Sequence, residues 1–173
     1  EERSRHMVDI AKESLQNIPA TKNDEFDNYI YKSPLGVIFV MAPWNYPIIT
    51  ATNTIVPALL AGNTLVLKHS SQTPMCAELI NKAFENTGLP EGVFQFVHTN
   101  HQACEKIISD PRVSHVVFTG SVRGGQEVKK YIGTRFINVG LELGGKDPAY
   151  VRADADLNHA VDNLVDGALF NSG

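Results

Sequence analysis

The sequence has 173 residues, 43% of them hydrophobic and 20% charged, with a formal net charge of -4. This length allows one domain with a substantial core, or one domain and part of a second. The acidic balance and the scattered basic residues argue against a nucleic-acid partner, and no apolar run reaches the ~18 residues that a membrane-spanning helix needs.

The cysteines and histidines are too dispersed to predict a metal site. Cys76 and Cys104 form neither a disulfide framework nor a metal-ligand spacing, and the six histidines are scattered. Two cysteines without such a pattern favour a reducing compartment, so we expect a cytoplasmic protein, with the mitochondrial matrix as the alternative.

The first 34 residues predict a peripheral arm rather than a core. Apolar residues at helical spacing indicate a helix over residues 7–18, which Pro19 ends. A polar stretch follows, and Tyr29–Tyr31 then has the pattern of a short strand.

From Gly36 onward, strands and helices alternate. Val37–Met41 is a continuous apolar run, as expected for a strand that is covered on both faces of a parallel sheet. Further strands are predicted at residues 64–67, 93–97, 116–118 and 136–140, with extended chain at 148–151, and helices at residues 48–60, 74–84, 102–109, 121–132 and 157–169. The alternation predicts an α/β fold with a doubly wound parallel sheet.

Local signals mark several helix ends. Gly62 fits the C-terminal end of the helix at 48–60. Thr73 provides a hydroxyl cap for the next helix, with Pro74 at its first position, and Ser121 caps the helix at 121–132.

Three unusual stretches directly follow predicted strands, where ligands bind in open parallel sheets. The first is Pro43–Pro47, in which Asn45 stands between rigid neighbours. Its side-chain amide N–H could stabilise an oxyanion, and a purely structural turn is the alternative.

The second stretch is Lys68–Ser71, just past the second strand of the sheet. In dinucleotide-binding sheets this is where the adenosine ribose is read, and a lysine there can bond ribose hydroxyls or a 2′-phosphate. No Asp or Glu follows to repel such a phosphate. A solvated lysine before a helix cap is the alternative.

The third stretch, Phe118–Gly125, combines a strand, a turn and a helix with glycines. Ser121 and the free N–H groups of the helix start could hold a pyrophosphate. The stretch does not follow the G-x-G-x-x-G pattern, and a glycine turn before a helix is by itself weak evidence.

An acidic residue, Glu142, stands in an apolar run and precedes Gly144 and Gly145. We expect it at or just past the end of the strand at 136–140, which has the composition of a short buried strand. The glycines let a ligand or another backbone come close. Glu142 is therefore a candidate general base in apolar surroundings, and a surface glutamate beside a turn is the alternative.

Together, and in this order, these motifs resemble the aldehyde dehydrogenase superfamily. The similarity runs from about Tyr29 to Gly173. Five motifs carry it: Pro43–Pro47, Lys68 with Gln72–Pro74, Gly88–Pro90 with Gly92 and Val93, Phe118–Ser121, and Glu142–Lys146.

The resemblance implies a Rossmann-like cofactor domain and the beginning of a second α/β catalytic domain. It implies an N-terminal helix of the cofactor domain at residues 1–15 and an oligomerisation arm at 16–34. An NAD(P)-binding domain at 35–144 and the start of the catalytic domain at 145–173 follow. The full-length enzyme would then be a homodimer or homotetramer.

The same resemblance implies roles for single residues. Asn45 is the side-chain donor of the oxyanion hole, and Glu142 is the general base that activates the hydrolytic water. Lys68 contacts the adenosine ribose, and Ser121 contacts the pyrophosphate. The other expected cofactor-binding residues are Met41, Pro43, Trp44, Ser71, Gly120 and Gly144, the last of them close to the nicotinamide.

The implied reaction oxidises an aldehyde to a carboxylic acid with NAD or NADP, through attack by a cysteine thiolate, hydride transfer and hydrolysis of a thioester. Many NAD-preferring members have Glu where this chain has Ser71. A carboxylate there would repel a 2′-phosphate, so Ser71 favours NADP or dual use. The pairing of Lys68 and His69 with Ser71 resembles members that act on semialdehydes such as succinate semialdehyde.

The family's nucleophile follows a Phe-x-x-Gly run like Phe170–Gly173, and the sequence stops a few residues before that position. Cys76 and Cys104 have the setting of packing cysteines instead. We therefore expect the middle of a longer enzyme, inactive on its own. A non-catalytic nucleotide-binding or structural protein on the same scaffold is the alternative, and an acylating relative that uses coenzyme A is a third, against which Glu142 argues.

Overall fold

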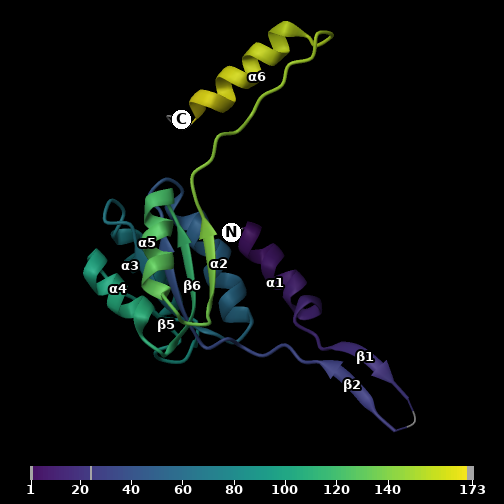
Figure 1. The fold of residues 1–173 in the computed structure, drawn as a ribbon, viewed down its shortest axis with the longest axis vertical. Coiled ribbons are helices and arrows are strands. Elements are labelled where there is room, and N and C mark those ends of the chain that lie inside the picture. Colours follow the sequence, from purple (N-terminus) through teal and green to yellow (C-terminus); the bar gives the residue numbers. More distant parts are fainter. Residues whose placement is uncertain (1, 24, 171–173) are drawn as a thin grey trace.

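The computed structural model describes residues 2–23 and 25–170, and a single parallel sheet forms the centre of this part of the chain. The chain begins with helix α1 (Glu2–Ser14), followed by an antiparallel hairpin of β1 (Ile18–Lys22) and β2 (Asp27–Ile30). Figure 1 shows the hairpin projecting away from the sheet.

The sheet has five parallel strands in the order β5-β4-β3-β6-β7. The strands are β3 (Val37–Ala42), β4 (Thr64–His69), β5 (Phe94–Phe96), β6 (Val113–Thr119) and β7 (Asn138–Glu142). The helices are α2 (Pro47–Leu60), α3 (Met75–Phe84), α4 (His101–Ser109), α5 (Val122–Ile132) and, beyond β7, α6 (Leu157–Leu169). The predicted doubly wound α/β fold is confirmed.

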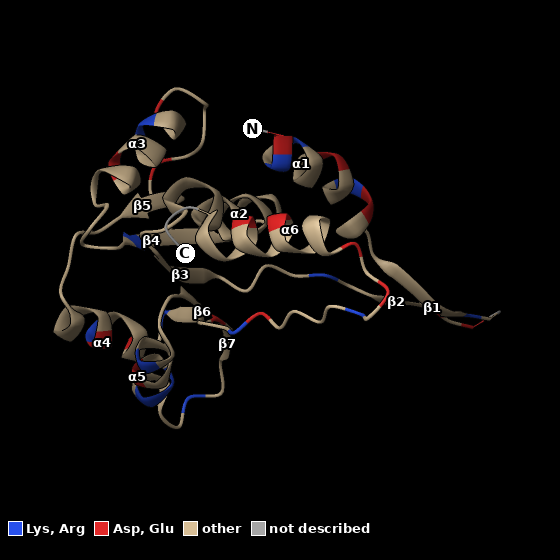
Figure 2. Cartoon of the chain, turned by 90° about the horizontal axis from the view of Figure 1, so that it is seen from above, with Lys and Arg blue, Asp and Glu red and all other residues tan. Residues whose placement is uncertain are grey.

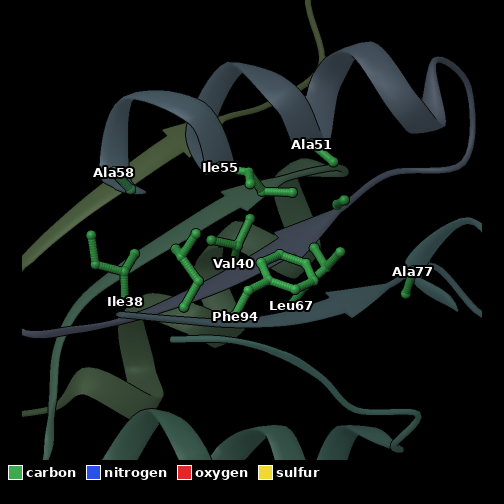
Figure 3. Packing of buried hydrophobic residues seen from close by; sticks show 10 residues of the cluster. Ile38, Val40, Ala51, Ile55, Ala58, Leu67, Ala77 and Phe94 are labelled. Carbon is green, nitrogen blue, oxygen red and sulfur yellow. The ribbon is translucent and has the colours of Figure 1, made fainter. Parts of the chain in front are cut away.

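β3 is buried on both faces, as its continuous apolar sequence predicts. Ile38 and Val40 face the layer of α2 and α3, where they belong to one core cluster, which Figure 3 shows beneath α2. Phe39 and Met41 face the opposite layer and join a second cluster. That cluster takes its other buried members from α4, β6 and α5: Cys104, Ile108, Val113, Val116, Val128 and Ile132.

Two of the predicted helix-end signals are found and one is wrong. Gly62 follows α2 with a φ of 82°, and Ser121 caps α5 through its hydroxyl oxygen. Thr73 does not cap α3, which begins at Met75 after Pro74. Its hydroxyl oxygen lies 3.0 Å from Nδ1 of His69 instead, because the buried histidine offers it a partner.

The structure corrects two further predictions. α1 ends at Ser14 rather than at residue 18, because Ile18 pairs with Ile30 in the hairpin. The last strand of the sheet covers 138–142 rather than 136–140, and it is half-exposed rather than buried, because it lies at the edge of the sheet. Phe136, which precedes it, is fully exposed.

The segment after Glu142 leaves the sheet, and in Figure 1 α6 lies apart from it. Residues 148–151 form no strand, and α6 contains no buried residue within the described part of the chain. The predicted domain limits at residues 15, 34 and 144 fall near element boundaries and stay predictions. Asn171, Ser172 and Gly173 of the Phe170–Gly173 run lie outside the described residues.

Leu67→Ala is expected to lower the free energy of unfolding by about 2–5 kcal/mol, because Leu67 is completely buried in the cluster beneath α2. Urea unfolding followed by circular dichroism measures the change. Leu79→Ala is the matched control, since this leucine of α3 is 57% exposed, and its expected effect is no more than about 0.5 kcal/mol. Equal losses in the two variants would contradict the observed burial.

Candidate cofactor and active site

Four neighbouring strands of the sheet, β4, β3, β6 and β7, end at the same edge. The register pairs Met41 with both Lys68 and Phe118, and it pairs Thr119 with Glu142. All ten predicted site residues therefore lie in the last two residues of these strands or in the segments that directly follow them.

The connection reverses direction at β3, which is where an open α/β sheet forms its ligand-binding crevice. From β3 the chain moves outward to β4 and β5, and then returns to the other side of β3 as β6 and β7. The segments after β3 and β6 consequently border the switch point. These are the turn that contains Asn45 and the turn that contains Ser121.

The turn after β3 begins at the buried Pro43 and then presents its side chains to solvent. Trp44 is 60% exposed, and Asn45 is also exposed. Within the described residues, the Asn45 amide has no hydrogen-bond partner, so its N–H groups are available to a ligand. α2 begins at Pro47, whose missing N–H costs nothing at a helix start.

The segment after β4 combines a half-buried lysine with a small loop. Lys68 has no ion-pair partner in the part of the chain that the structure describes, and Ser71 is exposed in the loop before α3. Between them, His69 is buried and bonded to both neighbouring segments. Burial is the main cause that lowers the pKa of His69; the bond to Pro47 raises it by less, and the positive charge of Lys68 lowers it slightly further.

The turn after β6 sits against an aromatic ring. A Cβ atom at Gly120 or Gly124 would lie only 2.6 or 2.5 Å from Cζ of Phe118, so the ring packs directly against the two glycines. The Ser121 hydroxyl oxygen accepts a hydrogen bond from the Gly124 amide at 3.1 Å. Its own proton stays available for a ligand, and the amides of the first helical turn have no acceptor within the helix. Such a helix start fits a pyrophosphate.

Glu142 is held at the edge of the sheet through its backbone and its neighbour. Its carbonyl oxygen accepts a 2.9 Å hydrogen bond from the Gly120 amide. Leu143 then packs onto α5, where a Cβ at Gly125 would lie 2.7 Å from Cδ2 of the leucine. The Glu142 side chain is exposed, which corrects the predicted apolar surroundings, because the chain turns away from the sheet directly after it.

Gly144 lies in open space, with no atom within 4 Å of a Cβ built there. A second open region lies beside the turn after β3. It is a pocket of about 610 Å³ between α1 and the first turns of α2, lined by Arg3, Ile48, Ile49 and Thr52 among others.

Neither cysteine has the setting of a nucleophile. Cys104 is buried in the second core cluster, and burial raises the pKa of its thiol. Cys76 is half-buried on α3. The interpretation of Cys104 as a packing residue agrees with this position.

The described residues form no metal site and no membrane-spanning helix. The described residues contain no group of three His, Cys, Asp or Glu side chains placed to hold a metal ion. Within the same residues, no helix has both the length and the apolar character to cross a bilayer. Lysines and arginines are spread over α1, α3, α4 and α5 in Figure 2 rather than gathered on one face.

Three residues make supporting contacts that the sequence did not predict. His69 bonds the Pro47 carbonyl, the Phe118 ring packs against the glycines of the turn after β6, and Leu143 packs against α5. Only the burial of His69 could have been predicted from the sequence. Every second residue of a strand lies on the same face, so His69 shares the buried face of Leu65 and Leu67. The other two contacts join residues from different elements.

Comparisons with known proteins agree on one family. The model of the aldehyde dehydrogenase family matches residues 3–173. A succinate-semialdehyde dehydrogenase [NADP(+)] 1 of Mycobacterium bovis is 42% identical over 140 residues, which cover 81% of this chain and 31% of that protein.

Two solved structures have the same fold. The succinic semialdehyde dehydrogenase of Streptococcus pyogenes, in complex with NADP+, superposes with a TM-score of 0.88 at 31% identity, over 97% of this chain and 37% of its own. An aldehyde dehydrogenase of Bacillus cereus, in complex with NAD+, has a TM-score of 0.89 at 30% identity, over 96% and 34%. The chain spans about a third of the length of the curated relatives it matches.

Gly125→Ala is expected to lower the free energy of unfolding by up to about 1 kcal/mol, because the added methyl group would overlap the end of the Leu143 side chain, which is 38% exposed and has to turn aside. In a Leu143→Ala background the same change is expected to be neutral or stabilising, since alanine is the better helix former. Urea unfolding of the four proteins of this cycle measures the coupling.

Gly167→Ala in α6 is the control for helix propensity, because a Cβ there meets nothing within 4 Å. It is expected to raise stability by up to about 1 kcal/mol. A cost of Gly125→Ala that persists without the Leu143 side chain would contradict the contact.

Proposed function

The chain belongs to the aldehyde dehydrogenase family, and from this premise we propose that the full-length protein oxidises an aldehyde to a carboxylic acid with NAD or NADP. One observation carries the proposal. The sheet brings an unpartnered amide, Asn45, and a carboxylate, Glu142, to the same edge as the segments suited to a dinucleotide. Dinucleotide binding alone requires neither of these two groups.

The residues present fit the cofactor. In this proposal Lys68 bonds the adenosine ribose and Ser121, with the amides that start α5, bonds the pyrophosphate. Gly120 belongs to the turn that would hold the phosphates, and its missing side chain leaves room for the Phe118 ring, whereas Gly144 leaves space for the nicotinamide, which accepts the hydride when the cofactor is bound. In the same proposal Trp44 and the backbone around Met41 and Pro43, whose side chains are buried, line the cofactor site.

Two residues serve the chemistry at the reacting carbon. Asn45 donates its side-chain N–H to the oxygen that becomes negatively charged when the carbonyl is attacked. Glu142 takes a proton from the water that hydrolyses the acyl group, and its solvent-exposed position gives water access to it. Cys76 and Cys104 are packing residues, so the full-length enzyme would supply the thiol that the family's reaction requires.

The neutral Ser71 supports NADP or dual cofactor use, because no carboxylate in the loop opposes a 2′-phosphate. The named mycobacterial relative is NADP-dependent, and the two similar structures hold NADP+ and NAD+. Two of these proteins are succinate-semialdehyde dehydrogenases, which supports a semialdehyde such as succinate semialdehyde as the substrate.

We also propose that the β1–β2 hairpin joins subunits in a homodimer or homotetramer. The hairpin projects from the body of the molecule in Figure 1, and all its strand residues are exposed. Among these exposed residues are the apolar side chains of Ile18, Tyr29 and Ile30, a composition suited to a subunit interface.

Asn45→Ala is expected to lower kcat about 100- to 1,000-fold, the loss that follows removal of one oxyanion donor, with cofactor affinity unchanged. Formation of reduced cofactor by the full-length enzyme with succinate semialdehyde measures kcat. Asn86→Ala, at an exposed asparagine just beyond the far end of α3, is the control and should have wild-type activity.

A higher kcat/KM of the wild type for an aromatic aldehyde than for succinate semialdehyde would contradict the proposed substrate. No aldehyde oxidation at all would contradict the proposed activity.

Ser71→Glu is expected to shift the ratio of kcat/KM for NADP to that for NAD by about tenfold or more toward NAD. The new carboxylate would accept hydrogen bonds from the ribose hydroxyls and repel a 2′-phosphate. Equilibrium titration of the full-length enzyme with each cofactor gives the two dissociation constants. Ser71→Gln adds similar bulk without charge, and an equal shift in this variant would rule out the electrostatic cause.

A further inference from the structure

His69, the last residue of β4, is a buried polar side chain to which the proposed function gives no role. It is 2% exposed and points into the layer that α2 covers. Its Nε2 lies 3.0 Å from the carbonyl oxygen of Pro47. Its Nδ1 lies 3.1 Å from the amide nitrogen of Ser70 and 3.0 Å from Oγ1 of Thr73.

These partners determine the tautomer of the ring. The Pro47 carbonyl can only accept, so Nε2 carries the proton and donates it. The Ser70 amide can only donate, so Nδ1 is unprotonated and accepts from it and from the Thr73 hydroxyl. The imidazole is therefore neutral, and its lowered pKa agrees with this state.

The ring joins two loops that carry residues of the proposed site. Pro47 begins α2 two residues after Asn45, and Ser70 and Thr73 flank Ser71 in the loop before α3. The ladder between β3 and β4 ends at the pair of Ala42 and His69. Both loops lie beyond this last pair, so the strand ladder does not hold them to each other, and the imidazole does.

We propose that His69 is a positioning residue that fixes the turn carrying Asn45 relative to the loop carrying Ser71. Its two nitrogens have separate tasks. The Nε2 bond holds the oxyanion donor against the sheet, and the Nδ1 bonds hold the loop that reads the adenosine ribose. This inference rests on the proposed function, because it concerns the oxyanion hole and the cofactor site assigned there.

Two substitutions separate the tasks in the full-length enzyme. His69→Asn keeps an acceptor near the position of Nδ1 and removes the donor to Pro47. His69→Gln keeps an N–H near the position of Nε2 and removes the acceptor for Ser70 and Thr73. Thr73→Val is a matched variant, because it removes the hydroxyl from the Nδ1 side with little change in shape.

We expect opposite patterns from these variants. His69→Asn lowers kcat roughly two- to tenfold, the effect of one neutral hydrogen bond, and leaves the cofactor dissociation constant within about twofold of the wild type. His69→Gln and Thr73→Val weaken cofactor binding by a similar factor and leave kcat close to the wild type. Steady-state kinetics and equilibrium titration with the cofactor supply the two constants.

The pH dependence of cofactor affinity is a further test, because a residue with a merely structural role would not change it. Protonation of Nδ1 below the ordinary histidine pKa, about 6.5, removes the acceptor, so wild-type cofactor affinity falls as pH falls through the lowered pKa. His69→Asn, which cannot titrate, should not show this loss. Among the described residues, few other titratable or charged groups surround the ring. α2 and β3 carry no charged side chain, and Lys68 is the charge that acts on the imidazole. α3 carries Cys76, Lys82 and Glu78, and the Glu78 carboxylate pairs with His98.

Equal losses of kcat and cofactor affinity in all three variants, in proportion to a lower melting temperature, would overturn the inference and leave His69 as core packing. Wild-type constants in both His69 variants would overturn it as well. Failure of the proposed function is seen separately, as a wild-type enzyme that binds cofactor without oxidising aldehydes. In that case the cofactor affinities of His69→Gln and Thr73→Val still test the loop half of the inference.

Discussion

Parallel pairing of four strands is the constraint on which the rest of this structure depends. Because β4, β3, β6 and β7 run in one direction, their carboxyl ends meet at one edge of the sheet. Residues separated by up to a hundred positions in the sequence are thereby brought to one edge of the sheet. The burial of β3 on both faces in turn fixes the sheet, since each face of this strand anchors one layer of helices.

A few close contacts beyond the strand ladder fix the positions of the segments at this edge of the sheet. The Gly120 amide bonds the Glu142 carbonyl, and Phe118 and Leu143 fill the space that side chains at the glycines of the turn and of α5 would occupy. These contacts explain why glycines stand where the backbone conformation itself does not require them. Gly120, Gly124 and Gly125 have ordinary φ values, and their lack of a side chain serves packing rather than a left-handed turn.

The sequence was sufficient to predict the alternation of strands and helices and the edge of the sheet where the unusual residues gather. Both follow from local patterns, because a long apolar run such as Val37–Met41 is readable without knowledge of its neighbours. Burial of the last strand was not readable in this way, because β7 has the composition of a core strand but an edge position. The partner of Thr73 was missed for a similar reason, since His69 reaches it only after the loop has folded back.

The central place of β3 has a consequence for the order in which the sheet assembles. β3, β4 and β5 follow one another along the chain with a helix after each of the first two, so this half can form from contacts that are close in sequence. The other edge of β3 receives β6, which begins at Val113, more than seventy residues later. Until then an apolar strand has one unpaired edge, the kind of surface that makes folding intermediates prone to aggregate. For this chain, the vulnerable interval during synthesis is the one between the completion of β5 and the arrival of β6.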